Sequence, residues 1–212
     1  FRIESTTSRK SKLSSDCDSQ SPTGAWMDLY DVTADKHYSV NVATGEFRDQ
    51  GGTGAGGGGS VRDDLIWHKT RDEHWMITNT TLDLTTLKGV VKRSITLPVF
   101  TTTPTGAVTG QTWRTGTRGD TIGFLTCVAT TSGETHHWIQ PFELEEGALL
   151  PGWWINDADP AEYRLHNPHP GTTKLFMFPS PGQSDFHVAN WDGSGWQQLT
   201  SPQPGGFVHP TV

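Results

Sequence analysis

The sequence predicts an all-β protein, an antiparallel β-barrel or sandwich with long loops and at most one or two short helices. Three observations lead to this class. The 212 residues include 24 glycines and 13 prolines, which suit many short strands joined by turns better than a helical bundle. Nine tryptophans and nine phenylalanines supply enough apolar area to fold, although the apolar fraction is only 33%. Runs rich in Thr, Val, Ile, Phe and Trp recur at short intervals between turn signals.

The domain organisation follows from composition along the chain. Residues 1–22 are polar and aperiodic, so we expect a linker or an arm that lies on a surface. Residues 23–212 are expected to form a single β domain. The glycine-rich run at 51–60 lacks the Gly-Lys-Ser/Thr ending of a phosphate-binding loop, and we expect a flexible exposed loop there.

The candidate strands are short runs whose residue types fit a pleated, half-buried surface. They are expected at Ala25–Tyr30, His37–Val42, Leu65–His68, His74–Asn79, Val90–Phe100, Thr121–Thr131, Thr135–Gln140, Lys174–Phe178, Phe186–Trp191 and Gly195–Thr200. Within Val90–Phe100, the odd-numbered residues from Val91 to Val99 form the expected inward face.

Two local signals accompany the strands. In the run Trp191–Trp196, Asp192-Gly193 is expected to supply the positive φ angles of a tight hairpin, whose flanking tryptophans can pair across the strands. The run Asp159–Glu162 is expected to begin a short helix, with aspartate as its N-cap and proline at the first helical position.

The negative charge is concentrated in one acidic segment, residues 119–163. The protein has a net charge of -7, and this segment has eight carboxylates and no lysine or arginine, which leaves 16 basic against 15 acidic residues elsewhere. The eight are Asp120, Glu134, Glu143, Glu145, Glu146, Asp157, Asp159 and Glu162. Trp138, Trp153 and Trp154 lie in the same segment. An acidic surface with indoles disfavours phosphate backbones, so nucleic acid is not an expected partner, whereas hydroxyl-rich or cationic partners fit.

The candidate binding residues lie at the end of this segment. Trp153 and Trp154 precede Asn156 and Asp157, with Tyr163 as a neighbour. A ring that stacks on a sugar face, with amide and carboxylate groups that bind hydroxyls, is suitable recognition chemistry. The alternative is that both indoles fill the core or a subunit interface.

The sequence has no catalytic or metal-binding signature. It lacks the Gly-x-Ser-x-Gly elbow of a serine hydrolase. A glycosidase needs two carboxylates placed across a sugar, and the sequence cannot place Glu143, Glu145, Asp157 or Asp159 in this way. His136 and His137 are expected on a strand, where their rings point to opposite faces and cannot bind one ion together. We therefore expect no enzyme activity, no cofactor and no metal ligand, and a glycan-cleaving enzyme remains a third alternative.

The cysteines and the hydropathy add two further expectations. Cys17 and Cys127 are expected as free thiols, although a bridge between them is possible. No stretch approaches the ~18 apolar residues of a membrane span, so membrane insertion is not expected.

One short string and the overall organisation carry a resemblance to viral capsid proteins. The string VNVATG, Val40–Gly45, is similar to a segment in the protruding domain of hepatitis E virus capsids. A polar tether before one Thr-, Gly- and Trp-rich β domain resembles the spike (projection) domain of astrovirus capsid proteins, avian types included.

The resemblance implies a homodimeric projection on the surface of a non-enveloped virion. Such a domain mediates attachment to a host-cell receptor, either glycan or protein, and is exposed to antibodies. No site residue is carried over, because no site motif matches. The alternative is a carbohydrate-binding module of a phage tail fibre or of a secreted bacterial protein.

Overall fold

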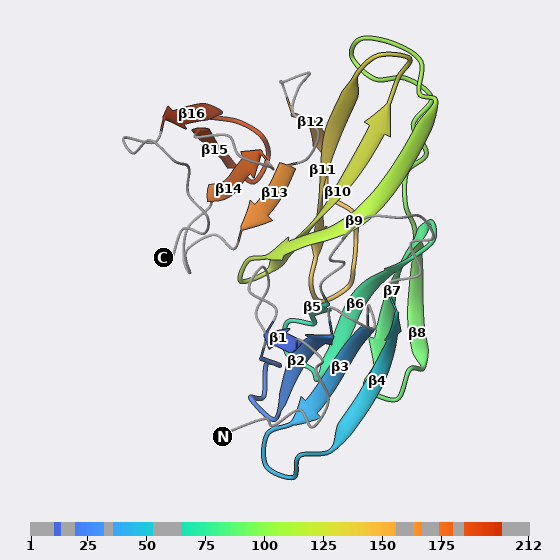
Figure 1. Ribbon diagram of the computed structural model, residues 1–212, viewed down its shortest axis with the longest axis vertical. Helices are drawn as coiled ribbons and strands as arrows, with labels where there is room; N and C mark the ends of the chain where they lie inside the picture. The colour runs from blue at the N-terminus through green and yellow to red at the C-terminus, as the bar shows by residue number, and fades with distance from the viewer. Residues whose placement is uncertain are drawn as a thin grey trace.

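The computed structural model (Figure 1) describes residues 11–13, 20–31, 36–52, 65–155, 163–166, 174–179 and 185–200. These residues form sixteen β-strands in four antiparallel sheets of four strands each. They contain no helix and close into no barrel. The predicted all-β antiparallel class is therefore confirmed, in a sandwich-like form. The helix expected from Asp159 lies outside the described residues.

Every sheet is built in the same way, from four strands that follow one another in the chain and pair with their neighbours. The first sheet has β1 (Ser11–Leu13), β2 (Trp26–Asp31), β3 (Lys36–Asn41) and β4 (Phe47–Gly52). The second has β5 (Ile66–Trp67), β6 (Glu73–Thr78), β7 (Thr81–Thr86) and β8 (Val91–Thr96). The third has β9 (Gly110–Arg118), β10 (Ile122–Thr130), β11 (Thr135–Glu143) and β12 (Trp153–Trp154). The fourth has β13 (Tyr163–His166), β14 (Lys174–Pro179), β15 (Asp185–Asn190) and β16 (Gln197–Thr200).

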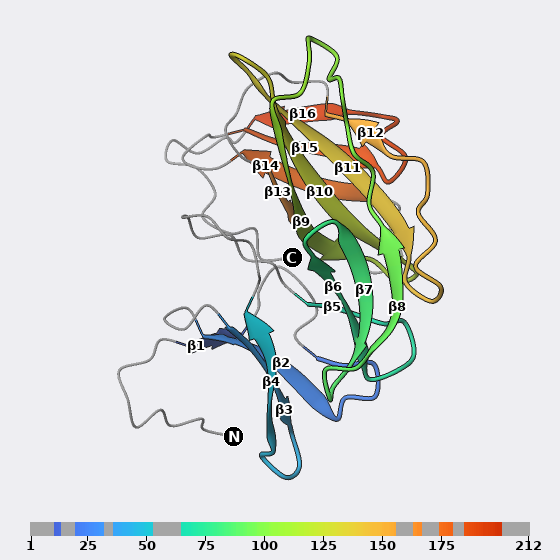
Figure 2. The same ribbon diagram turned by 90° about the vertical axis from the view of Figure 1, so that its right-hand side faces the viewer.

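The sheets stack face to face in chain order and follow an open arc (Figures 1 and 2). The first strand of the third sheet, β9, lies beside the first strands of both neighbours, β5 and β13. Four-stranded antiparallel sheets repeated radially are the construction of a β-propeller, in which each sheet is one blade. The described residues form four sheets of this kind and no closed ring.

The third sheet is buried on both faces because its central strands are apolar at successive positions. In β10, Leu125 and Cys127 belong to a core shared with the second sheet. Phe124 points the opposite way, into a core shared with Leu175 and Ala189 of the fourth sheet. Successive residues of a strand face opposite sides, so a continuous apolar run serves two layers at once.

The turn that follows β11 fixes the third sheet to the second. The indole N–H of Trp75 donates to the backbone oxygen of Leu144 at 2.8 Å. Gly147 has a φ of +71°, which favours glycine. A Cβ at this position would lie 2.3 Å from Cη2 of Trp75 and 2.4 Å from Cδ1 of Ile95. The turn therefore needs glycine both for its backbone and for its fit against the second sheet.

The prediction that the odd-numbered residues of Val90–Phe100 face inward is wrong for most of them. The strand β8 ends at Thr96, and its pairing with β7 contains a register shift. Val91 is 50% exposed and Val99 is 71% exposed, whereas Leu97 is buried. The reason is that β8 is the edge strand of the second sheet, and Pro98 follows it, so the chain leaves the sheet soon after Leu97.

The turn between β15 and β16 forms where it was predicted, with a different backbone. Positive φ angles occur at Gly193 (+82°) and Gly195 (+64°), and Asp192 does not adopt one. The Asp192 carboxylate instead accepts from the backbone N–H of Ser194 at 3.0 Å and from its hydroxyl at 2.7 Å. Trp196 packs edge-on against Trp153 of the third sheet.

Two segments expected to lack structure contribute to the first sheet. Ser11–Leu13, within the expected tether, forms β1 and pairs with β2. The first two glycines of the glycine-rich run, Gly51 and Gly52, complete β4. The rest of that run, 53–60, lies outside the described residues.

Replacing Gly147 by alanine should destabilise the fold more than the same change at Gly89. Both glycines have positive φ, but a Cβ at Gly89 meets nothing within 4 Å. Gly89→Ala should cost about 1 kcal/mol for the backbone alone. Gly147→Ala should cost a further ~1–3 kcal/mol because the methyl group displaces Trp75. Urea unfolding of both variants measures the difference, and equal costs would show that the turn is not held against Trp75.

Candidate functional site

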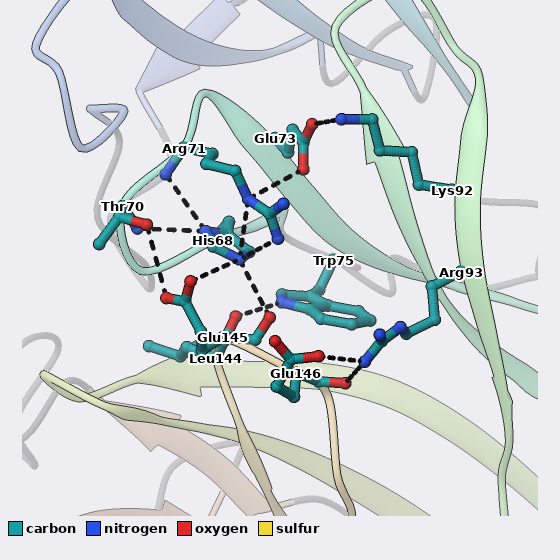
Figure 3. A network of polar contacts seen from close by, with 10 residues as sticks. All are labelled: His68, Thr70, Arg71, Glu73, Trp75, Lys92, Arg93, Leu144, Glu145 and Glu146. Carbon is teal, nitrogen blue, oxygen red and sulfur yellow. Dashed lines mark hydrogen bonds and ion pairs between the residues drawn. The ribbon is translucent and has the colours of Figure 1, made fainter.

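Three carboxylates of the acidic segment, Glu134, Glu145 and Glu146, lie in two polar clusters. The first, the junction cluster, lies between the second and third sheets (Figure 3). It brings together His68, Thr70, Arg71, Glu73, Lys92, Arg93, Glu145 and Glu146.

His68 is the buried centre of the junction cluster, and its hydrogen bonds define its state. Nδ1 accepts from the backbone N–H groups of Thr70 at 3.1 Å and Arg71 at 3.2 Å. Nε2 lies 3.1 Å from the backbone oxygen of Glu145 and 2.6 Å from a guanidinium nitrogen of Arg71. Burial, and then the charge of the Arg71 guanidinium, lower the pKa of His68 below its ordinary value. The ring is thus neutral and structural.

The carboxylates around His68 are paired with cations of the second sheet. Arg93 donates to the Glu146 carboxylate at 2.6 Å and to its backbone oxygen at 2.5 Å. Glu73 is ion-paired with Lys92 and, at 3.4 Å, with Arg71. The exposed Arg93–Glu146 pair contributes less than about 1 kcal/mol, so it sets the orientation of the turn more than its stability. The junction cluster therefore joins two sheets, and we assign it no ligand.

The two predicted binding tryptophans are half-buried and point to opposite faces of the third sheet. In β12, Trp154 pairs with Trp138, and Trp153 pairs with Ile139. Trp154 packs against Trp138 at 5.2 Å and against Phe100 at 4.9 Å between ring centroids. Trp153 faces the fourth sheet, where its Nε1–H donates to the backbone oxygen of Trp191 at 3.2 Å. The two rings therefore do not form one platform.

The other predicted site residues cannot be placed beside them. Asn156 and Asp157 lie outside the described residues. Tyr163 begins β13, where its backbone pairs with Pro179, and its side chain is not among those described. Binding of a ligand by the set Trp153, Trp154, Asn156, Asp157 and Tyr163 stays a prediction.

The second polar cluster, the rim site, consists of Thr105, Glu134, His136 and Trp154. The Thr105 hydroxyl donates to the Glu134 carboxylate at 2.6 Å. That hydroxyl has one proton, so Nε2 of His136, 2.7 Å away, donates to the hydroxyl oxygen and lies 3.2 Å from the same carboxylate. The hydrogen bond from Thr105, and then that from His136, lower the pKa of Glu134. The cluster therefore holds an ionised carboxylate in a fixed position.

An aromatic surface adjoins this carboxylate. The His136 ring is edge-on to Trp154, with centroids 6.3 Å apart and an interplanar angle of 83°. Trp154 is half-buried, whereas Thr105 and Glu134 are exposed. The rim site thus combines a charged acceptor, a hydroxyl and an indole at one edge of the third sheet, which is the chemistry that recognises a sugar.

The two adjacent histidines point to opposite faces of β11, as predicted. His136 lies across from Ala129, and His137 across from Val128, on the side of the fourth sheet. Burial, and then the charges of Arg114 and His136, lower the pKa of His137 to about 4. The described residues contain no group of three or more His, Cys, Asp or Glu that could hold a metal ion.

Two further observations concern the cysteines and the membrane. Cys127 is a buried free thiol, and its burial raises its pKa to about 12. Cys17 lies outside the described residues. Within the part of the chain that the structure describes, no helix is long and apolar enough to span a membrane.

Comparisons with known proteins yield only distant structural likenesses. No family model and no curated protein matches the sequence. Hydrazine synthase of Kuenenia stuttgartiensis aligns with a TM-score of 0.46 and 11% identity, over 94% of this chain and 53% of that one. The WD40 domain of SCAP from fission yeast has a TM-score of 0.37 and 12% identity, over 87% and 44% of the two chains. BBS1N, in its complex with ARL6DN, has a TM-score of 0.38 and 8% identity, over 90% and 57%. The chain spans about half the length of these proteins, and at these scores the likenesses indicate neither family nor function.

The stability of the fold should decrease as the pH falls from 7 to 5. The folded pKa of His137 is about 4, against 6.5 for the unfolded chain, so the unfolded state binds more protons in this window. Its contribution is complete above pH 6.5 and is lost as the pH falls towards 4, by about 2 kcal/mol at pH 5. His68 acts in the same direction. In urea titrations at both pH values, His137→Gln should lose less stability than the wild type, and an equal loss in both would contradict the assignment.

Proposed function

We propose that this chain is a non-catalytic recognition module that binds a glycan through the rim site of the third sheet. One observation supports the proposal above the others. An ionised carboxylate, Glu134, is held by Thr105 and His136 next to the half-buried indole of Trp154.

The rim site matches the two sides of a sugar ring. The C–H face of a pyranose is apolar and stacks on an indole, while its hydroxyls donate to an acceptor at the ring edge. An ionised carboxylate accepts several hydrogen bonds, and those to a charged group are the stronger kind. Glu134 is already fixed by two partners, so little side-chain entropy is lost when a ligand binds.

The same geometry favours binding over glycan cleavage. Glycosidases use two carboxyl groups on either side of the scissile bond, and their general acid has a raised pKa. Among the described residues of the rim site, Glu134 is the one carboxylate, and its pKa is lowered. A carboxylate that stays ionised is an acceptor for hydroxyls and a poor proton donor.

The biological setting that we propose is host attachment, as the resemblance to virus capsid projections implies. The module would then stand on the virion surface, contact a host-cell receptor and be exposed to antibodies. The string VNVATG forms the end of β3 and a turn, in which the Asn41 side-chain oxygen accepts from the N–H groups of Ala43 and Thr44 and Gly45 has positive φ. These are requirements of many tight turns, so the support from this string is local. A carbohydrate-binding module of a tail fibre or secreted protein would use the same rim chemistry.

Glycan binding should depend on Glu134 and Thr105. A glycan array identifies a ligand, and calorimetry then compares the wild type with Glu134→Gln and Thr105→Val. Loss of a hydrogen bond to a charged acceptor should weaken binding about tenfold or more. Glu143→Gln is the matched control, because Glu143 is an exposed carboxylate at the other end of β11 and should leave the affinity unchanged.

Two outcomes would count against this function. One is a wild-type protein that binds no glycan on the array. The other is a glycan whose affinity is the same for wild type and Glu134→Gln, which would place the ligand elsewhere on the molecule.

A further inference from the structure

The two hydrogen bonds that hold Glu134 fall on the same carboxylate oxygen. The Thr105 hydroxyl and Nε2 of His136 both lie against Oε2, at 2.6 Å and 3.2 Å. The other oxygen, Oε1, has no hydrogen-bond partner among the described residues. The Glu134 side chain is 44% exposed, so the lone pairs of Oε1 are open to a ligand. The carboxylate is therefore fixed through one oxygen and available through the other.

The rim site is built from two stretches of the chain that contain no lysine or arginine. The connection after β8 contributes Thr105, and it has no basic residue between Arg93 and Arg114. The acidic segment, residues 119–163, contributes Glu134, His136 and Trp154. A fixed carboxylate in such surroundings attracts a cationic group of a ligand and repels an anionic one.

The two arginines that border the first stretch are engaged elsewhere. Arg93 is ion-paired with Glu146 in the junction cluster. The charge of Arg114 acts on His137, which points towards the fourth sheet. Trp113, the neighbour of Arg114 in β9, packs in the core shared with the second sheet. Successive residues of a strand face opposite sides, so Arg114 lies on the face of the third sheet away from the rim site.

Trp154 adds a surface that suits both a sugar and a cation. Its ring is half-buried against Phe100 and Trp138, with centroids 4.9 Å and 5.2 Å away, and these contacts hold it in place. An indole face stacks on the apolar face of a pyranose, and it also attracts a cation through its ring quadrupole. A sugar ring that carries an ammonium group satisfies the indole and the carboxylate together.

We propose that the rim site selects glycans whose sugars carry a free, protonated amine, and that it rejects sialylated and other acidic glycans. In the complex, the ammonium donates to Oε1 of Glu134 while the sugar ring lies on Trp154. A hydroxyl donates to the same oxygen, but an ammonium adds the attraction between opposite charges. The inference rests on the glycan-binding function proposed above and names the class of sugar that this site takes.

Two tetrasaccharides that share a sugar backbone and differ at their amines test the selectivity. Calorimetry compares a glucosamine tetramer with an N-acetylglucosamine tetramer, under conditions where the free amines are protonated. The wild type should bind the glucosamine tetramer at least about tenfold more tightly. Added salt should reduce this preference, because a partly exposed charge pair is screened. Sialyllactose should bind more weakly than lactose, because its carboxylate is repelled by Glu134.

Glu134→Gln keeps the shape of the side chain and removes its charge. The preference for the glucosamine tetramer should fall to less than about threefold in this variant. Glu143→Gln is the matched control, because it removes the same charge from an exposed carboxylate at the other end of β11. The net charge of -7 attracts cations in general, so a preference that Glu143→Gln leaves unchanged belongs to the rim site.

Several results would overturn the selectivity. These are failure to bind the glucosamine tetramer, equal or tighter binding of the N-acetylated one, tighter binding of sialyllactose than of lactose, and a preference that survives Glu134→Gln. If a neutral or acidic glycan still binds in a way that depends on Glu134, the glycan-binding function stands and the selectivity alone is wrong. If no glycan of any charge binds, both proposals fail. Thermal unfolding of Glu134→Gln checks that the variant is folded.

Discussion

The fit of the turn after β11 against Trp75 is the constraint on which the rest of the arrangement depends. The indole donates its N–H to the backbone oxygen of Leu144, and Gly147 lies directly against the ring. A buried indole N–H without a partner costs free energy, so this bond fixes the distance and orientation between the second and third sheets. Phe142 packs edge-on to the same ring and extends the contact into the core. Among the described residues, the fourth sheet packs on the other face of the third, so its position follows from this contact as well.

The three junctions of the arc differ in chemistry. The second–third and third–fourth junctions contain continuous apolar clusters. The first–second junction instead buries polar groups, Ser39 from one side and Thr85 and Trp67 from the other, whose side-chain polar atoms have no hydrogen-bond partner in the described structure. Buried polar groups without partners reduce the gain from burial. The first sheet is therefore held less strongly than the other three.

The fold class and ten of the sixteen strands could be predicted because they depend on local rules. The runs rich in β-branched and aromatic residues at Thr121–Thr131 and Thr135–Gln140, and the Asp-Gly turn before β16, are readable from the sequence. Strands β7 and β9 were not predicted, because β7 offers only two alternating leucines, Leu82 and Leu84, and β9 has one large apolar residue, Trp113. The stacking of the sheets could not be predicted from the sequence either, because it depends on packing between segments that are distant in sequence.

The rim site could not be predicted for a related reason. Thr105 and Glu134 are 29 residues apart and meet only because the connection after β8 folds over the turn before β11. The sequence marked Glu134 as one of eight carboxylates and His136 as one of two adjacent histidines, and it gave no sign of the threonine that joins them. Of the two tryptophans that the sequence singled out, Trp154 belongs to the rim site. Trp153 instead packs in the junction between the third and fourth sheets.

The charge asymmetry that marks the acidic segment has a structural consequence. With no lysine or arginine within the segment, its carboxylates must find cations elsewhere in the chain. Glu146 forms an ion pair with Arg93 of the second sheet. Glu145 lies beside His68 and Thr70, which also belong to the second-sheet region of the chain. Such pairs add little stability at an exposed site, but pairing the wrong sheets would leave these carboxylates without cations. The asymmetry therefore favours the stacking of the third sheet on the second, while Glu134, which is held by Thr105 and His136, remains an acceptor for a ligand.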